Sequence, residues 1–215
     1  MEELKEAAFP YTAPKETPAK KISFEEFLAW YDEDIRAEWV DGEVIFLTPA
    51  SLRHQEIKKF LCFILDMFVR LNKLGRVVDA PFLVHLPESL RRGREPDVLF
   101  VKKERLHLLK ETYLDGPPDL VVEITSPESF ARDRGEKYLE YEAAGVSEYW
   151  LIDPERQQAE FYRLGPDNRY HLFTADEKGV YRAAVLPGFW LKVDWLWQEE
   201  MPLVIDVLRE MKLFD

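Results

Sequence analysis

Cysteine is almost missing from this chain of 215 residues, and Cys62 is its single example. One cysteine cannot form a disulfide within the chain, and it excludes a zinc site built from several cysteines. Cys62 falls on the apolar face of a predicted helix, so we interpret it as a buried thiol rather than a reactive one.

Long hydrophobic runs are also missing, since none approaches the ~20 residues that a membrane-spanning helix needs. The longest candidate, residues 57–71, is interrupted by four charged side chains. Residues 1–20 are acidic and then proline-rich, contain no hydrophobic signal core, and are predicted to form a mobile tail. We therefore expect a cytoplasmic protein with no membrane partner.

Positive charge is in the minority, with 29 Lys and Arg against 41 Asp and Glu and a net charge of −12. That balance disfavours broad, non-specific attraction to nucleic acid, although local charge can differ from the total. The sequence also has no glycine-rich phosphate loop of the G-x-x-x-x-G-K kind and no G-x-S-x-G elbow. Its four histidines lack metal-ligand spacing, and His85 alternates with apolar neighbours as a structural residue would.

Patterns of helices and strands are present along most of the chain, and 47% apolar residues suit a packed core. Ser23 and Glu26 have the spacing of a capping box, and Asp41-Gly42 predicts a two-residue hairpin turn. Apolar periodicity predicts helices over 51–75 and 130–145, strands over 76–86, 97–101, 119–125 and 147–153, and shorter β segments after 156. This order predicts one α/β domain, residues 21–215, with a mixed central sheet and a β-rich extension from about 156.

Two acidic residues stand in or beside these apolar strands. Asp97 begins the run "DVLFV", and Glu123 lies within "DLVVEITS". Neighbouring strands could bring both carboxylates together, and a divalent cation such as Mg²⁺ would relieve their repulsion. The alternatives are that Asp97 caps a turn after Pro96 and that Glu123 pairs with an arginine across the sheet.

A lysine on the following helix could join these acids. Lys137 shares a helix face with Asp133 and Tyr141, and from there it could reach back over the strand end. In that place it could orient a metal-bound water or stabilise charge on a phosphoryl group. The alternative is an ordinary surface pair between Asp133 and Lys137.

The segments "PDVLF" and "GPPDLVVEITSPESFARDRGEKYLEYEAAGVSEYWLID" together resemble the PD-(D/E)XK nuclease superfamily. More narrowly, the ordered motifs over residues 23–155 resemble the Uma-two family of restriction endonucleases. The resemblance implies the restriction-endonuclease-like fold, a mixed central sheet flanked by helices. It also implies a Mg²⁺- or Mn²⁺-dependent endonuclease that hydrolyses the phosphodiester bonds of DNA.

The same resemblance implies roles for individual residues. Asp97 and Glu123 correspond to the two motif acids and would be metal ligands, with the backbone carbonyl of Ile124 as a further contact. The superfamily's lysine usually follows the second acid by two residues, where this chain has Thr125. Lys137 therefore resembles a lysine that has migrated to the helix.

Two more residues match the family's pattern less specifically. Glu38 resembles an additional N-terminal acid of the catalytic site, and its alternative is a solvated hairpin residue. His54 matches a family histidine that orients water or contacts phosphate, and its alternative is a structural histidine at a helix start.

Basic residues near Asp97 and on the second helix could form a rim that approaches DNA phosphates. They are Arg91, Arg92, Arg94, Lys102, Lys103, Arg132 and Arg134. The alternative is that these residues are ordinary solvated ones in loops.

Two rival functions remain open at this level. The first is a catalytically silent nuclease-like fold that binds a partner protein, with the aromatic stretch 188–197 as an interface or simply as core. The second is a metal-dependent hydrolase of a small phosphorylated substrate. A homodimer is plausible in either case, because the β-rich extension offers exposed strands.

Overall fold

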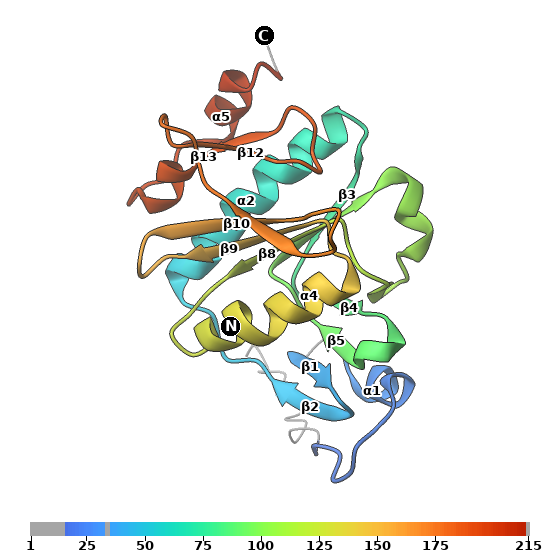
Figure 1. The fold of residues 1–215 in the computed structure, drawn as a ribbon. Coiled ribbons are helices and arrows are strands. Elements are labelled where there is room, and N and C mark those ends of the chain that lie inside the picture. Colours follow the sequence, from blue (N-terminus) through green and yellow to red (C-terminus); the bar gives the residue numbers. More distant parts are fainter. Residues whose placement is uncertain (1–15, 33–34, 214–215) are drawn as a thin grey trace, which may run out of the picture.

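The centre of the protein is a six-stranded mixed sheet (Figure 1). The computed structural model describes residues 16–32 and 35–213, so most of the predicted N-terminal tail lies outside the described part. The strand order is β11-β10-β9-β8-β6-β3, and the β8–β9 pair is parallel whereas the other pairs are antiparallel. The strands are β3 (Gly75–Asp79), β6 (Val98–Lys102), β8 (Leu120–Ile124), β9 (Glu148–Asp153), β10 (Gln158–Leu164) and β11 (Tyr170–Phe173).

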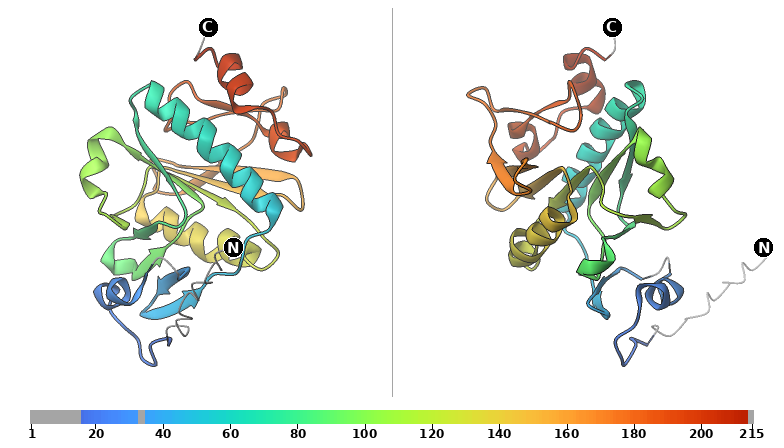
Figure 2. Two further views of the ribbon diagram at one scale, coloured as in Figure 1. Left: turned by 180° about the vertical axis from the view of Figure 1, so that it is seen from behind. Right: turned by 45° about the vertical axis from the view of Figure 1, so that its right-hand side comes forward.

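Helices cover both faces of this sheet (Figure 2). The apolar face of α2 (Leu52–Leu71) packs on side chains of one sheet face, including Val122 and Trp150. The opposite face meets the helical segment 130–144, which consists of α3 (Phe130–Arg132), a π-helical turn (Asp133–Lys137) and α4 (Tyr138–Ala144). The predicted α/β class and both predicted helices are therefore confirmed.

A second sheet of five strands adjoins the first and has the order β2-β1-β5-β4-β7. Its strands are β1 (Ala37–Val40), β2 (Glu43–Phe46), β4 (Leu83–His85), β5 (Arg92–Arg94) and β7 (Tyr113–Asp115). The predicted Asp41-Gly42 turn joins β1 to β2, and both of its residues have the positive φ that such a turn requires. Helix α1 (Phe24–Trp30) begins at the predicted capping box of Ser23 and Glu26 and packs on this sheet through Phe24 and Trp39.

Two strand predictions need correction here. The segment 76–86 is not one strand, because β3 ends at Asp79 and the chain turns at Ala80-Pro81 before β4 joins the other sheet. Strand β5 was not predicted, since three residues of the sequence "RGR" carry no alternation of apolar and polar side chains. From β5 the chain crosses to β6 through residues 95–97, and this crossing shapes the site described below.

The C-terminal part completes the core of the domain. Strands β10 and β11 extend the central sheet, whereas β12 (Val180–Arg182) and β13 (Trp190–Lys192) form a separate pair. The aromatic stretch 188–197 serves as core, because Phe189, Leu191 and Leu196 are buried against α2 and the sheet. Helix α5 (Val204–Glu210) follows, and short 3₁₀ helices lie at Glu88–Leu90, Lys103–Leu108 and Val193–Trp197.

Across residues 16–32 and 35–213, no helix combines the length and the apolar character needed to cross a membrane.

Candidate functional site

The two strand acids lie side by side where the large sheet meets the small one. Asp97 directly precedes β6 and Glu123 lies in β8, and the Val98–Val122 register of these antiparallel strands places the two acids opposite each other. Both line a narrow cavity of about 70 Å³, together with His54, Ile124 and Lys137. The structure therefore brings together four of the predicted site side chains and the Ile124 backbone.

Asp97 is held by groups from two other elements. Its Oδ2 accepts a hydrogen bond from the backbone N–H of Ile124 at 2.8 Å and lies 3.1 Å from Nε2 of His54. Ser51 caps α2 and accepts from the backbone N–H of His54, which fixes this histidine at the helix start. Asp97 thus ties two strands and a helix together, and the prediction that it merely caps a turn after Pro96 is wrong.

Glu123 is buried and its partners come from the helical segment above β8. Its Oε1 accepts from Nζ of Lys137 at 2.9 Å and from the hydroxyl of Tyr141 at 2.8 Å. Burial, reinforced by nearby carboxylates, raises the pKa of Glu123 to about 8 even though Lys137 opposes that rise. The alternative of an arginine partner across the sheet is wrong.

Three carboxylates surround the ammonium group of Lys137. Besides Glu123, its Nζ lies 3.1 Å from an oxygen of Glu38 and 3.4 Å from Oδ1 of Asp133. Burial alone would lower the pKa of Lys137, but these carboxylates outweigh it and raise the pKa, so the side chain stays an ammonium. The pair with Asp133 is fully buried, so the surface-pair alternative is wrong.

The position of Lys137 has a structural cause. Thr125 lies two residues beyond Glu123 on the same side of the chain, where a lysine could also have faced this carboxylate. Instead, the helical segment covers that sheet face, and Lys137 ends its π-helical turn directly over Glu123. Single π-helical turns within helices are frequent at functional sites.

Glu38 is fully buried, so its interpretation as a solvated hairpin residue is wrong. It bridges the small sheet to the site, because its two oxygens contact Lys137 and Nη1 of Arg94, the latter at 2.8 Å. Burial would raise the pKa of Glu38, but the charges of Lys137 and Arg94 prevail and lower it to about 2. Glu38 therefore remains ionised and helps to hold the lysine in place.

Sequence reasoning missed the supporting roles of three residues, Arg94, Glu140 and Glu95. Arg94 is buried and donates to both oxygens of Glu140, at 2.7 and 2.8 Å, which anchors the helix that carries Lys137. Glu95 lines the acid cavity and accepts from Tyr31 and Arg36. The run of charged residues in "RGREPD" directly before an apolar strand was the available signal, because so many charges beside a buried strand need partners.

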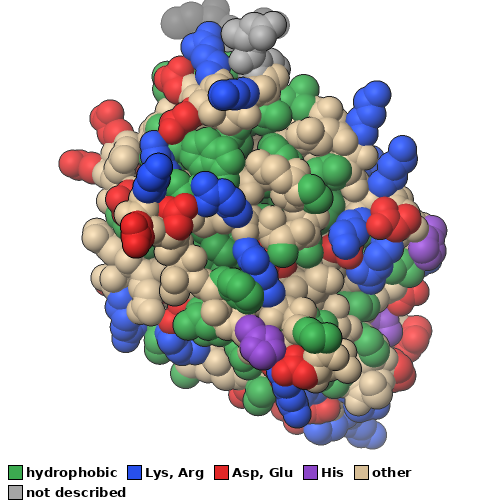
Figure 3. Space-filling model, turned by 45° about the horizontal axis from the view of Figure 1, so that its top comes forward, with side chains coloured by type: hydrophobic (Ala, Val, Ile, Leu, Met, Phe, Trp, Pro, Cys, Tyr) green, Lys and Arg blue, Asp and Glu red, His purple; other side chains and the backbone are tan. Residues whose placement is uncertain are grey.

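The predicted basic rim does not form as expected. Arg94 is internal, Arg92 pairs with Glu140 and Asp41, and Arg134 pairs with Glu160. Of the seven predicted rim residues, only Arg132 lines the acid cavity. On the face shown in Figure 3, basic and acidic side chains are interspersed around hydrophobic ones, so positive charge does not gather there into one patch.

A hard cation fits the free oxygens of the two acids. In the part of the chain that the structure describes, neither Oδ1 of Asp97 nor Oε2 of Glu123 has a hydrogen-bond partner, whereas the other oxygen of each is held. No group of three or more His, Cys, Asp or Glu side chains among the described residues is placed to hold a metal. Two free carboxylate oxygens would still be enough to hold Mg²⁺, which commonly uses one or two carboxylates and keeps waters or substrate oxygens as its other ligands.

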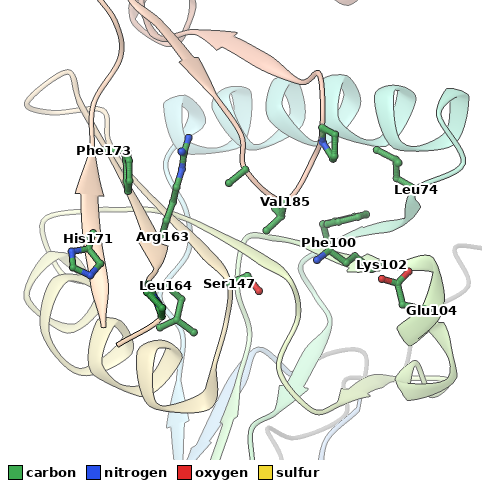
Figure 4. Close-up of a pocket in the computed structure, with 14 residues that line it drawn as sticks. Leu74, Phe100, Lys102, Glu104, Ser147, Arg163, Leu164, His171, Phe173 and Val185 are labelled. Atoms are coloured by element: carbon green, nitrogen blue, oxygen red, sulfur yellow. The ribbon is translucent and has the colours of Figure 1, made fainter. Parts of the chain in front are cut away.

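A larger cavity of about 620 Å³ lies at the opposite strand ends of the central sheet (Figure 4). It is lined by Ser147 at the start of β9, Leu164 at the end of β10 and Lys102 at the end of β6. Arg163 and His171 also line it; Arg163 donates through Nε to Tyr181 and through Nη2 to Arg182, and Nε2 of His171 lies 3.0 Å from Asp167. None of the predicted site residues lines this cavity.

Comparisons with known proteins agree with this geometry. The chain is similar to a crystal structure described as "a putative nuclease belonging to DUF820" from Anabaena variabilis ATCC 29413, with a TM-score of 0.68 and 20% sequence identity. The match covers 82% of this chain and 97% of that one, and it shows that the two share the restriction-endonuclease-like fold. No curated protein matches the chain. The family Uma2, described as "Putative restriction endonuclease", matches residues 24–194, and this chain belongs to that family.

Proposed function

We propose that this protein is a metal-dependent endonuclease that hydrolyses phosphodiester bonds of DNA, with Mg²⁺ or Mn²⁺ as its cation. One observation carries the proposal: Asp97 and Glu123 each present a free oxygen to the same cavity, beside a lysine that is held as an ammonium. The family description and the description of the Anabaena protein support a nuclease.

In this proposal, Asp97 and Glu123 hold the cation, and the Ile124 carbonyl is a further ligand. A bound cation lowers the pKa of a water molecule and neutralises charge on the leaving oxygen. Tyr141 fixes the carboxylate of Glu123 through its hydroxyl. Lys137, held as an ammonium among Glu123, Glu38 and Asp133, would place its positive charge beside the phosphate, where it would stabilise the charge that develops there.

His54 fits this scheme as a group that positions Asp97 and a water molecule. Its Nε2 faces Asp97, and its Nδ1 is buried with no hydrogen-bond partner among the described residues. When Nε2 donates to the carboxylate of Asp97, a neutral ring keeps Nδ1 as an acceptor for a water. His54 therefore orients Asp97 on one side and is free to orient a water on the other.

The size of the cavity favours a polymer over a small phosphorylated substrate. At about 70 Å³ it is far smaller than the roughly 300–1,000 Å³ of pockets that enclose a small ligand. A single phosphate of a DNA strand can enter from outside while the rest of the strand stays on the surface. The alternative, a silent nuclease fold that binds a protein, makes no use of the free oxygens and the buried ammonium.

The test is cleavage of plasmid and linear DNA with Mg²⁺, Mn²⁺ or EDTA, on wild type and the Asp97→Asn and Lys137→Met variants. We expect cutting that needs metal and that both substitutions abolish while circular dichroism shows a folded chain. Cleavage by wild type in EDTA would contradict the metal requirement. A folded wild type that neither cuts DNA nor binds metal would favour the catalytically silent protein-binding module. A screen of nucleotides for hydrolysis would test the alternative of a small phosphorylated substrate.

We also propose the homodimer and the cytoplasmic location that the sequence suggests. Strand β11 lies at an edge of the central sheet and exposes Leu172 and Phe173, which could form part of a contact between two copies. Light scattering would contradict the homodimer if it gave the mass of a single chain at all concentrations used for activity. Fractionation of cells would test the location.

A further inference from the structure

Among the residues that the structure describes, Arg132 is a cation without an ion-pair partner in an acidic cavity. It lines the same cavity as Asp97, Glu123 and Asp133, and its charge is close enough to help lower the pKa of Glu38. Its Nε is buried, yet within residues 16–32 and 35–213 it has no hydrogen-bond acceptor, and its guanidinium forms no ion pair with any described carboxylate. A buried donor that remains unpaired is costly and calls for an explanation.

The other cations that line this cavity are occupied. Arg36 donates to Glu95 through Nε and Nη2. Lys137 is surrounded by Glu123, Glu38 and Asp133. Arg132 is therefore the one cation of the cavity, among its described lining residues, whose donors are still available to an incoming group.

The chemistry of the guanidinium indicates what that group is. It is planar, stays charged, and presents several N–H donors in a fixed fork that matches phosphate oxygens. The neighbouring carboxylates do not pair with it: Asp133 faces Lys137, one oxygen each of Asp97 and Glu123 is held by His54, the Ile124 N–H or Lys137, and their free oxygens are the proposed cation ligands. An anion that enters from outside can therefore use the Arg132 donors without displacing an existing pair.

We propose that Arg132 binds a non-bridging oxygen of the phosphodiester group that the site cleaves. This inference rests on the proposed endonuclease function and adds a specific contact to it. The acids of the cavity and the Arg132 guanidinium then take opposite parts: the acids hold a cation, and the arginine draws the anionic phosphate toward them. Its contact strengthens as charge develops on the phosphate oxygens in the transition state.

The same helical segment supplies a matched control. Arg134 lies two residues further on, is partly exposed, pairs with Glu160 and packs over the ring of Phe130. It does not line the acid cavity. Replacing Arg134 removes the same charge from the same segment without removing a donor from the site.

The experiment compares wild type, Arg132→Gln, Arg132→Lys and Arg134→Gln, with folding checked by circular dichroism. Binding of a short fluorescent DNA duplex is measured in EDTA between about 50 and 200 mM salt, and cleavage kinetics are measured with Mg²⁺. We expect Arg132→Gln to lower kcat about a hundredfold and to make the slope of log affinity against log salt shallower by about 0.9, the value of one lost phosphate contact. Arg132→Lys should recover part of both, and Arg134→Gln should resemble wild type.

The outcomes separate this inference from the function on which it rests. If wild type cuts and Arg132→Gln matches Arg134→Gln in both kcat and salt slope, the phosphate contact is wrong and the endonuclease stands. If wild type does not cut but binds the duplex with a salt slope that only Arg132→Gln reduces, the contact stands and the cleavage function fails. If wild type neither binds nor cuts, both proposals fall. Should Arg132→Gln not fold, the Arg132→Lys kinetics decide: a kcat below wild type supports the contact, because lysine lacks the fixed fork of donors, and a kcat equal to wild type contradicts it.

Discussion

Glu123 and Glu148 are both buried glutamates, and they lie at opposite ends of the neighbouring strands β8 and β9. Glu148 accepts from the indole of Trp150, the hydroxyl of Tyr181 and the backbone N–H groups of Ala184 and Val185, so both of its oxygens are held. Glu123 has one oxygen held by Lys137 and Tyr141, whereas no described residue donates to the other.

The two residues show that burial of an acid in a strand is not by itself a sign of function. Glu148 is satisfied by neutral donors from its own core, which is the usual state of a buried polar group. Glu123 is surrounded by other ionisable groups, and burial together with the nearby carboxylates raises its pKa to about 8 against the opposing charge of Lys137. The functional sign is therefore an acid whose hydrogen-bonding capacity the fold leaves unfilled.

The largest expected effect is a difference in kcat between variants of Glu123 and Glu148. Because only Glu123 is proposed to hold the cation, Glu123→Gln should lower kcat for DNA cleavage by about a thousandfold, a loss of about 4 kcal/mol of transition-state stabilisation. Glu148→Gln should leave kcat per folded molecule within about twofold, since its side chain lies outside the cavity. Steady-state kinetics on purified, folded protein measure both values. Equal losses in the two variants would contradict the distinction.

The second prediction concerns stability, where the loss of Glu148 should cost more than the loss of Glu123. Glu148→Ala leaves four donors without their acceptor, three of them buried, and at about 1 kcal/mol or more for each buried donor the free energy of unfolding should fall by about 3 to 4 kcal/mol. Glu123→Ala should lower it by less, because Lys137 keeps Glu38 and Asp133 as partners. Urea unfolding of both variants at neutral pH measures the difference, and a more stable Glu148→Ala would show that this carboxylate is not the anchor that the contacts indicate.

Sequence patterns were sufficient for those parts of the site that depend on local structure. The acids Asp97 and Glu123 stand out because they interrupt apolar strands, and Lys137 stands out because helix periodicity aligns it with Tyr141. The supporting network was not visible, because Arg94 meets Glu38 and Glu140 across 56 and 46 residues of sequence. Such pairs depend on how two sheets and a helix meet, and no local period records that arrangement.

The predicted basic rim failed because its arginines pair with acids inside the protein. The arginines before Asp97 were expected at a basic rim, but β5 carries Arg92 and Arg94 toward Glu140 instead. A three-residue strand without apolar alternation gives no signal of where its side chains point. Conversely, the sequence left Glu38 open between an additional acid of the site and a solvated hairpin residue, and its strand position is buried at the junction of the two sheets beside Lys137.

The third prediction concerns Glu38, whose pKa is lowered whereas that of the neighbouring Glu123 is raised. The charges of Lys137 and Arg94 overcome the burial of Glu38 and lower its pKa from 4.5 to about 2. A lowered pKa stabilises the fold above pH 4.5, and that contribution disappears as the pH falls through about 2. The difference in unfolding free energy between wild type and Glu38→Gln should therefore shrink by about 3 kcal/mol as the pH drops from about 5 to 2. Urea titrations across that range measure it, and a constant difference would contradict the lowered pKa.

The smallest effect is the response of stability to the cation. Because binding to the folded state alone stabilises it, Mg²⁺ at a hundred times its Kd should raise the unfolding free energy by about 2.7 kcal/mol. The rise should vanish in Asp97→Asn, which removes a proposed carboxylate ligand from the cavity, and persist in Glu148→Gln, which lies at the other end of the sheet. Thermal unfolding with and without Mg²⁺ compares the two variants. An equal rise in both would place the cation elsewhere on this acidic chain, and the free oxygens of Asp97 and Glu123 would then need another partner.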